Sequence, residues 1–179
     1  MLAAHALQIA RWESFYVIVG SSAGALTGLQ FVVIALQQEK LNENARHAIR
    51  AFGSPTIVHF TSVLGLAAIL SMPRHTRASL GGTVLTIATG LLLYVLWAFR
   101  KARQQDAYAP DLGDWIWHYA LPSIVYVSMM IAGASAWHSP NETLTVVAAG
   151  VLGLLIIGIH NAWDSAVWIV INRGSGQEG

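Results

Sequence analysis

The sequence has no cysteine and few charged residues for its length. Without thiols, the chain can form no disulfide, no thiolate metal site and no cysteine nucleophile. Charged residues make up 11% of the 179 residues, whereas soluble domains average about 25%. Hydrophobic residues make up 55%, which is more apolar surface than a small soluble domain can bury. These shortages exclude an ordinary soluble domain and predict a protein whose surface faces lipid.

Two further features are missing. The net charge is only +1 and basic residues form no concentrated patch, so we expect no nucleic-acid partner. The loops contain neither a Ser-His-Asp arrangement nor paired carboxylates, and no HExxH motif is present. We therefore predict no catalytic residues and no enzyme activity.

Five stretches are long and apolar enough to be helices that cross a bilayer. A bilayer core about 30 Å thick needs roughly 20 helical residues, and backbone groups in hydrocarbon must bond within the segment. The stretches are residues 14–36, 55–72, 79–99, 115–137 and 143–171, and only Asp164 in the last one carries a charge. The sequence therefore predicts an all-α integral membrane protein whose single domain, residues 14–172, is a bundle of about five transmembrane helices.

Shorter segments flank and connect these helices. In residues 1–13 Arg11 follows a short apolar run instead of preceding it, which is unlike a signal peptide and predicts an interfacial segment. Residues 37–54 are polar and predict helical extensions or a short surface helix. Asp114 is expected to cap the fourth helix. Residues 173–179 are polar and glycine-rich, and predict a flexible tail.

The distribution of Lys and Arg predicts which side of the membrane each loop faces. Alternate connections carry three basic residues on one side and seven on the other: Arg11, Arg74 and Arg77 against Lys40, Arg46, Arg50, Arg100, Lys101, Arg103 and Arg173. Loops with an excess of basic residues remain in the cytoplasm. We therefore expect the N-terminus outside and the C-terminus in the cytoplasm.

Small residues mark the faces where helices can approach closely. Gly20, Gly24 and Gly28 recur every four residues on the first span, and in lipid such a ridge allows backbone proximity and dispersion contacts. The ridge fits packing within one chain or between subunits of a homo-oligomer. On the fifth span, Gly150 and Gly153 lie on the face that carries the helix's polar residues, and are expected to pack against a neighbour.

Five polar residues of the spans, four of them ionisable, fall in the predicted cytoplasmic leaflet: Gln30, His59, His118, His160 and Asp164. Ionisable groups inside a membrane are costly and usually turn towards the bundle interior, so each is a candidate site residue. His160 and Asp164 are four residues apart, share a helix face and are expected to be buried together. Pro122 lacks an amide hydrogen, which predicts a kink and a free carbonyl at His118.

Three interpretations of this polar layer remain open. A carboxylate beside imidazole suits a proton or ion pathway, so the first is an oligomeric, channel-like or transporter-like protein. The second is a structural or regulatory membrane subunit in which hydrogen bonds only hold the helices together. In the third, His59, His118, His160 and Asp164 hold a metal, or two histidines hold haem. No cofactor is predicted outside that third interpretation. The partners expected are membrane lipid, further copies of the chain and another membrane protein.

The first span carries a resemblance to a known group. Residues 11–36, RWESFYVIVGSSAGALTGLQFVVIAL, resemble the start of small bacterial multi-span proteins in which a tryptophan and phenylalanine precede a Gly/Ala-rich helix ending in LTGLxFV. That group has no established activity, and some members carry automatic labels as modulators of a membrane protease. The resemblance implies a helical bundle in a bacterial inner membrane and transfers no active-site residue.

Overall fold

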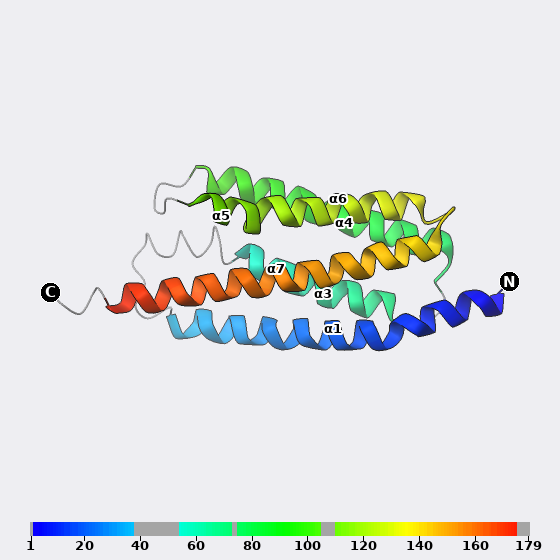
Figure 1. The fold of residues 1–179 in the computed structure, drawn as a ribbon, viewed down its shortest axis with the longest axis horizontal. Helices are drawn as coiled ribbons and strands as arrows, with labels where there is room; N and C mark the ends of the chain where they lie inside the picture. Colours follow the sequence, from blue (N-terminus) through cyan, green and yellow to red (C-terminus); the bar gives the residue numbers. More distant parts are fainter. Residues whose placement is uncertain (1, 38–53, 73–74, 105–109, 175–179) are drawn as a thin grey trace.

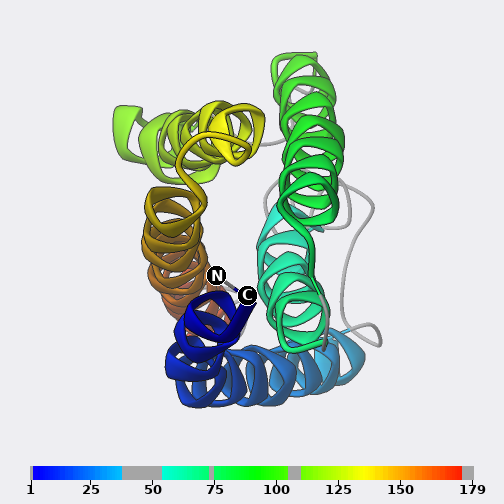
Figure 2. The same cartoon turned by 90° about the vertical axis from the view of Figure 1, so that its right-hand side faces the viewer.

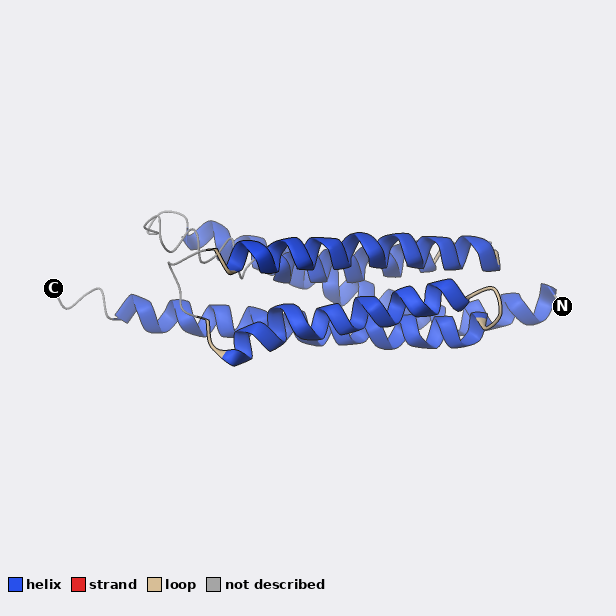
Figure 3. Cartoon of the chain, turned by 90° about the horizontal axis from the view of Figure 1, so that it is seen from above, coloured by secondary structure: helices blue, strands red, loops and turns tan. Residues whose placement is uncertain are grey.

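The computed structural model describes residues 2–37, 54–72, 75–104 and 110–174, and almost all of them are helical (Figure 1). The long helices are α1 (Leu2–Gln37), α3 (Ser54–Leu70), α4 (Arg77–Ala102) and α7 (Pro140–Gly174). Between α4 and α7 lies a continuous rod made of α5 (Leu112–Trp115), the π-helical segment η2 (Ile116–Ala120) and α6 (Leu121–Ser135). The described residues contain no strand (Figure 3), which confirms the all-α prediction.

Four helical segments are long and apolar enough to cross a membrane: Trp12–Ala35, Arg77–Ala102, Leu112–Ser135 and Pro140–Val167. The second predicted span differs from these. Its helix α3 has 17 residues, which at 1.5 Å per residue gives about 25 Å, a few ångströms less than a bilayer core. The described residues therefore contain four helices of membrane-spanning length and one shorter apolar helix.

Both ends of the predicted domain differ from the sequence-based boundaries. α1 begins at Leu2 and runs without a break into the first span, so residues 2–13 belong to the same helix as the span, which itself covers Trp12–Ala35. Its first turns project past the other helices in Figure 1. α7 continues to Gly174, so the predicted tail is shorter by two residues, and residues 175–179 lie outside the described part. The segment predicted at residues 37–54 also lies outside it, apart from its two ends.

The fourth predicted span begins earlier than expected because its cap is Asp111 and not Asp114. The Asp114 N–H donates to Oδ1 of Asp111 over 2.8 Å, and the Asp111 N–H donates to Oδ2 of Asp114 over 3.0 Å. This is a capping box, in which the N-cap and the third helical residue satisfy each other's amide. Asp114 is thus the reciprocal partner of the cap, one turn into the helix.

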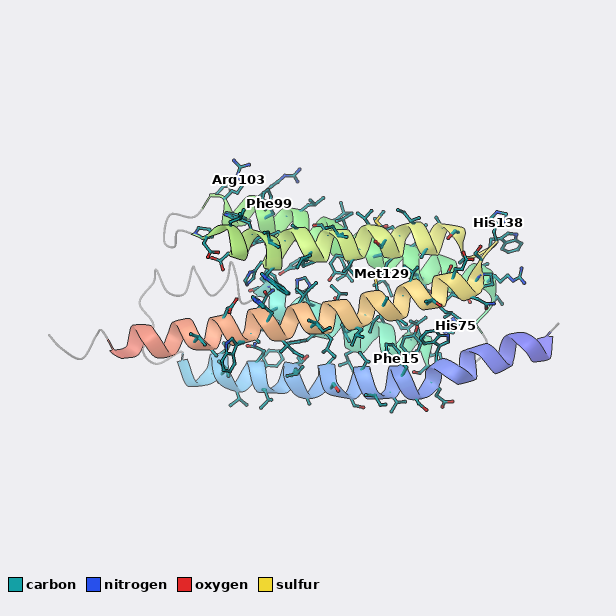
Figure 4. All side chains as sticks on the ribbon, in the orientation of Figure 1. Phe15, His75, Phe99, Arg103, Met129 and His138 are labelled. Atoms are coloured by element: carbon teal, nitrogen blue, oxygen red, sulfur yellow. The ribbon has the colours of Figure 1, made fainter. Side chains whose placement is uncertain are left out.

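Each helix packs mainly against one or two neighbours, in the order α4, α6, α7, α3 and α1. Seen from the end, α6 and α1 lie at opposite edges, with α7 and α3 between them (Figure 2). The fully buried side chains that fill the space between these helices are apolar in most positions and include Phe60, Val63, Leu66, Met129, Val147, Val151 and Leu154. Figure 4 shows Met129 between α6 and α7, near the middle of the bundle.

The outward faces of the helices carry large apolar side chains. Ile18, Leu93, Ile124 and Ile131 each expose more than 60% of their surface. A soluble protein of this size would aggregate through such faces, whereas hydrocarbon accepts them without cost. The apolar exterior and the four long helices together identify a membrane protein.

A direct backbone contact joins α4 to α6 and depends on glycine. A Cβ atom at Gly81 would lie 2.6 Å from the carbonyl oxygen of Gly133, and a Cβ at Gly133 would lie 2.9 Å from the amide nitrogen of Leu85. Because these neighbours are backbone atoms, they cannot move aside as a flexible side chain can. Only glycine at both positions allows the two backbones to touch.

The predicted glycine ridge on α1 is used over part of its length. A Cβ at Gly20 would lie 2.9 Å from the Cβ of Ala67 on α3, whereas at Gly24 it would have ordinary contacts with Leu64, and at Gly28 it would meet nothing within 4 Å. The ridge therefore packs against α3 of the same chain at Gly20 and opens away from it towards Gly28.

The two glycines singled out on α7 face α6. A Cβ at Gly150 would lie 2.7 Å from the Met129 methyl carbon, and one at Gly153 would lie 3.7 Å from Val125. Gly158 is tighter, because a Cβ there would lie 2.5 Å from the ring of Phe60 on α3. α7 is thus held closely on two sides, by α6 and by α3.

Replacing Gly81 with alanine should destabilise the protein, because the added methyl group would overlap the Gly133 carbonyl. The expected cost is about 1–3 kcal/mol, as for other overpacked positions. Gly82→Ala is the matched control: a Cβ there meets nothing within 4 Å, and alanine favours a helix over glycine by up to about 1 kcal/mol. Melting temperatures of the two variants in detergent should separate, with Gly81→Ala below wild type. Equal melting temperatures would contradict the contact.

Candidate functional site

The π-helical segment η2 changes which carbonyl group Pro122 leaves without a donor. In η2 the Leu121 N–H donates to the carbonyl of Ile116, five residues earlier. In that register the donor for the carbonyl of Trp117 would be residue 122, and proline has no N–H. The carbonyl of Trp117, next to the His118 carbonyl that the sequence singled out, therefore lacks this backbone donor.

Asn161 supplies the missing donor from α7. Its Nδ2 donates to the carbonyl oxygen of Trp117 over 3.3 Å, and its side chain is fully buried. An unsatisfied carbonyl in an apolar interior costs several kcal/mol, so this bond compensates for the proline. Sequence reasoning missed Asn161 because it carries no charge. Its place one residue after His160, inside an apolar span, was the available signal.

His59 on α3 occupies a fully buried position, with 0% of its surface exposed. Its Nδ1 lies 2.9 Å from the hydroxyl oxygen of Tyr126 on α6, and that hydroxyl also hydrogen-bonds Ser62. His59 and Ser62 belong to the polar stripe on α3 that begins at Thr56, another fully buried residue. Tyr126 was not among the predicted site residues, because an aromatic ring in an apolar span has the pattern of a core residue.

His118 lies in η2 at the centre of the site, with 3% of its surface exposed. Its Nδ1 is 3.1 Å from the backbone carbonyl oxygen of Asp114. It lies within electrostatic range of His59, and also of His160 and Asp164. Three helical segments far apart in the sequence therefore bring His59, His160 and Asp164 each within electrostatic range of His118.

His160 and Asp164 lie at the edge of the bundle, contrary to the expectation that they are buried together. Nδ1 of His160 lies 3.1 Å from Oδ2 of Asp164, and the two side chains are 35% and 48% exposed. The reason is that Asn161 takes the inward position on this turn of α7, which places His160 about 100° around the helix. The imidazole of His160 stacks on the indole of Trp117, with ring centroids 3.8 Å apart and planes 5° from parallel.

The exposure of these four residues falls steadily from the edge of the bundle to its interior. Asp164 and His160 are partly exposed, His118 is almost covered and His59 is fully covered. Beyond His59 the buried side chains of α3 are apolar, beginning with Phe60 and Val63. These four residues, taken in order of falling exposure, are called the polar path below.

Gln30 and two other histidines lie apart from this path. Gln30 is half-buried on α1, a helix that contributes no member to the path. His75 and His138 lie at the end of the bundle opposite Phe99 and Arg103 (Figure 4). Nε2 of His75 is 2.7 Å from the carbonyl of Ile69, near the end of α3, so that histidine has a local capping role.

The metal interpretation receives no support from the geometry. Among the residues that the structure describes, no three His, Asp or Glu side chains are grouped so that they could hold a metal ion. His160 is turned towards Trp117 and Asp164, and His59 towards Tyr126. The four candidates therefore do not surround a common point as the ligands of a metal ion would.

Comparison with known proteins adds no relative. No family model matches the chain, and neither a curated protein nor a solved structure is significantly similar to it. The resemblance of residues 11–36 to small bacterial multi-span proteins therefore stays a prediction. The class of the protein, an all-α membrane protein with a polar path at one end, rests on its own helices and side chains.

Replacing Asn161 with alanine should lower the free energy of unfolding by about 1–3 kcal/mol, because the Trp117 carbonyl loses its donor in a buried position. Asn141→Ala, at the exposed start of α7, is the control and should be neutral. Melting temperatures in detergent provide the measurement.

A double-mutant cycle tests whether Asn161 compensates for the missing N–H of Pro122. Pro122→Ala restores an N–H at position 122, so the cost of Asn161→Ala should be smaller in that background than in wild type. Strictly additive costs would contradict the pairing of Asn161 with the carbonyl that Pro122 leaves free.

Proposed function

We propose that the protein is a membrane protein that carries protons between one face of the membrane and its interior through a relay of Asp164, His160, His118 and His59. The single observation that supports it most is the alignment of four titratable side chains from three helical segments, in order of falling exposure. Histidine changes its charge near pH 6.5 in water, so it can accept and release protons under physiological conditions.

Each residue has a distinct part in this relay. Asp164 and His160 form the outer end of the relay, where Nδ1 of His160 lies 3.1 Å from Oδ2 of Asp164. His118 lies between that pair and His59, and Asp114 adds a second carboxylate within its electrostatic range. His59 is the inner end, where Tyr126 holds its ring by a hydrogen bond.

The relay enters only part of the bundle, which favours a transporter-like mechanism over an open pore. The core beyond His59 is filled with apolar side chains, among them Phe60, Leu66 and Val151. A proton at His59 would reach the other side only through a change in helix packing. The positive-inside rule places the open end of the relay in the cytoplasm, and the resemblance of the first span suggests a bacterial inner membrane.

An oligomer remains part of this proposal. Ser21, Ala25 and Gly28 are small residues that share one face of α1 and are exposed in the single chain. Small residues on an apolar helix allow a second helix to approach closely. Contact between copies through this face would add to the α1–α3 packing without disturbing it.

A second candidate function follows from the same bonds. Asn161 joins α7 to the helix containing Trp117, and His59 joins α3 to α6. If these links serve stability alone, the protein is a structural or regulatory membrane subunit, such as the protease modulators named for the resembling group. The first function requires proton transport, and the second does not.

Proton uptake by proteoliposomes, followed with an internal pH-sensitive dye under an imposed potential, should distinguish them. A relay predicts flux in wild type that falls by roughly tenfold or more in Asp164→Asn and His160→Ala, because each removes a proton-transfer group. Both side chains are partly exposed, so these variants should keep the wild-type melting temperature. His138→Ala, an exposed histidine at the other end, should leave the flux unchanged.

The opposite result supports the second candidate. Wild-type liposomes without flux above empty ones, combined with lower melting temperatures for Asn161→Ala and His59→Phe, would mean that the buried polar residues only hold the helices together.

A further inference from the structure

Three basic side chains gather at the C-terminal end of α4. Arg100 and Lys101 belong to the last turn of the helix, and Arg103 is its C-cap residue. All three side chains are exposed. The ion pair found among the described residues joins His160 to Asp164, so these cations have no carboxylate partner in that part of the chain. Their charges are therefore available to an anion outside the protein.

The other end of α4 shows a different use of a basic residue. Arg77, the first residue of the helix, donates from Nη1 to the carbonyl oxygen of Trp137 over 3.5 Å. That carbonyl lies just beyond the end of α6, where a helix leaves its last acceptors without a donor. Arg77 thus serves the packing of the chain itself, whereas Arg100 and Lys101 have no such contact among the described residues.

Aromatic rings hold the charged end of α4 in place. The ring of Phe99 meets those of Trp115 and Tyr119 edge-on, with centroids 5.3 and 5.5 Å apart. The guanidinium carbon of Arg103 lies 5.9 Å from the centroid of the Phe99 ring, and Figure 4 shows the two residues side by side. This cation–π contact and the ring contacts restrict the last turn. The basic side chains therefore extend from a packed helix end.

The basic side chains continue the apolar outer face of α4. Leu93, Leu96 and Trp97 expose 62%, 41% and 55% of their surface. Arg100 follows Leu96 by four residues and Leu93 by seven, and Lys101 follows Trp97 by four, so all five lie on one side of the helix. These five residues are called the α4 lipid face. Tryptophan is typical of the membrane–water interface, and Trp97 lies where the apolar part of this face meets the basic part.

We propose that the α4 lipid face binds an anionic phospholipid of the surrounding leaflet, with its acyl chains along Leu93 and Leu96 and its phosphate between Arg100 and Lys101. Charge complementarity supports this occupant. Phosphate oxygens accept strong hydrogen bonds from guanidinium and ammonium groups, and Arg103 adds a third positive charge beside them. A zwitterionic headgroup would bring its own cation to the same place. A soluble phosphate would leave the apolar part of the face unused.

This site shares no residue with the polar path, so it can exist whether or not the protein carries protons. The positive-inside rule alone does not require it, because that rule counts basic residues anywhere in a loop. The α4 lipid face adds a fixed register, in which exposed apolar side chains lead directly to unpaired cations.

The test is competition between two lipids for the full-length protein in detergent, with bound lipid counted by native mass spectrometry. Dioleoylphosphatidylglycerol is anionic, and dioleoylphosphatidylcholine has the same acyl chains and a zwitterionic headgroup. We expect wild type to retain phosphatidylglycerol preferentially. Arg100→Gln and Lys101→Gln should each weaken its binding about fivefold, the contribution of one basic residue at an anionic membrane surface.

Two control variants separate the site from net charge. Arg77→Gln removes the same charge at the other end of α4 and should leave phosphatidylglycerol binding unchanged. Arg100→Lys keeps the charge and should retain most of the binding. The variants at positions 100 and 101 change exposed side chains, so they should keep the wild-type melting temperature in detergent.

Three results would overturn the proposal. Equal retention of the two lipids by wild type would mean that the headgroup charge is not recognised. A loss in Arg77→Gln as large as that in Arg100→Gln would mean that only net charge matters. Displacement of phosphatidylglycerol by an equal concentration of sn-glycerol 3-phosphate, which has the phosphate without acyl chains, would identify a site for a soluble phosphate instead of a lipid.

Discussion

The carbonyl group of Trp117 needs a hydrogen-bond donor inside an apolar bundle, and the arrangement of the site depends on how that need is met. Pro122 and the π-helical register together leave the group without a backbone partner. Asn161 reaches it from α7 and so fixes α7 against η2. The same contact brings His160 onto the indole of Trp117 and places His118, the next residue, towards the interior. One unsatisfied backbone group thereby sets the positions of two histidines.

Close backbone contact supplies the rest of the packing. In lipid the helices gain little from burying apolar side chains against one another, so association depends on dispersion contacts and on hydrogen bonds. Gly81 and Gly133 let the backbones of α4 and α6 touch, whereas Gly20 and Gly158 leave room for the side chains of Ala67 and Phe60 on α3. The bundle is therefore tight at the points where glycine removes a side chain.

The two ends of the bundle differ in chemistry, and the proposed function uses that difference. At one end, titratable side chains descend from the partly exposed Asp164 to the fully covered His59. Beyond His59 the core is apolar, which blocks continuous passage.

The sequence by itself determined the class of protein, because long apolar runs with few charges can form only membrane helices or a core too large for 179 residues. It also identified His59, His118, His160 and Asp164, since ionisable residues are conspicuous in such runs. Tertiary structure decided everything that depends on which helices are neighbours. It placed Gly81 and Gly133 at the backbone contact between α4 and α6, and His160 at the edge of the bundle. It also added Asn161 and Tyr126 to the site, and their hydrogen-bond partners lie 44 and 67 residues away in the chain. Local pattern carries no information about partners at that separation, because only packing brings them together.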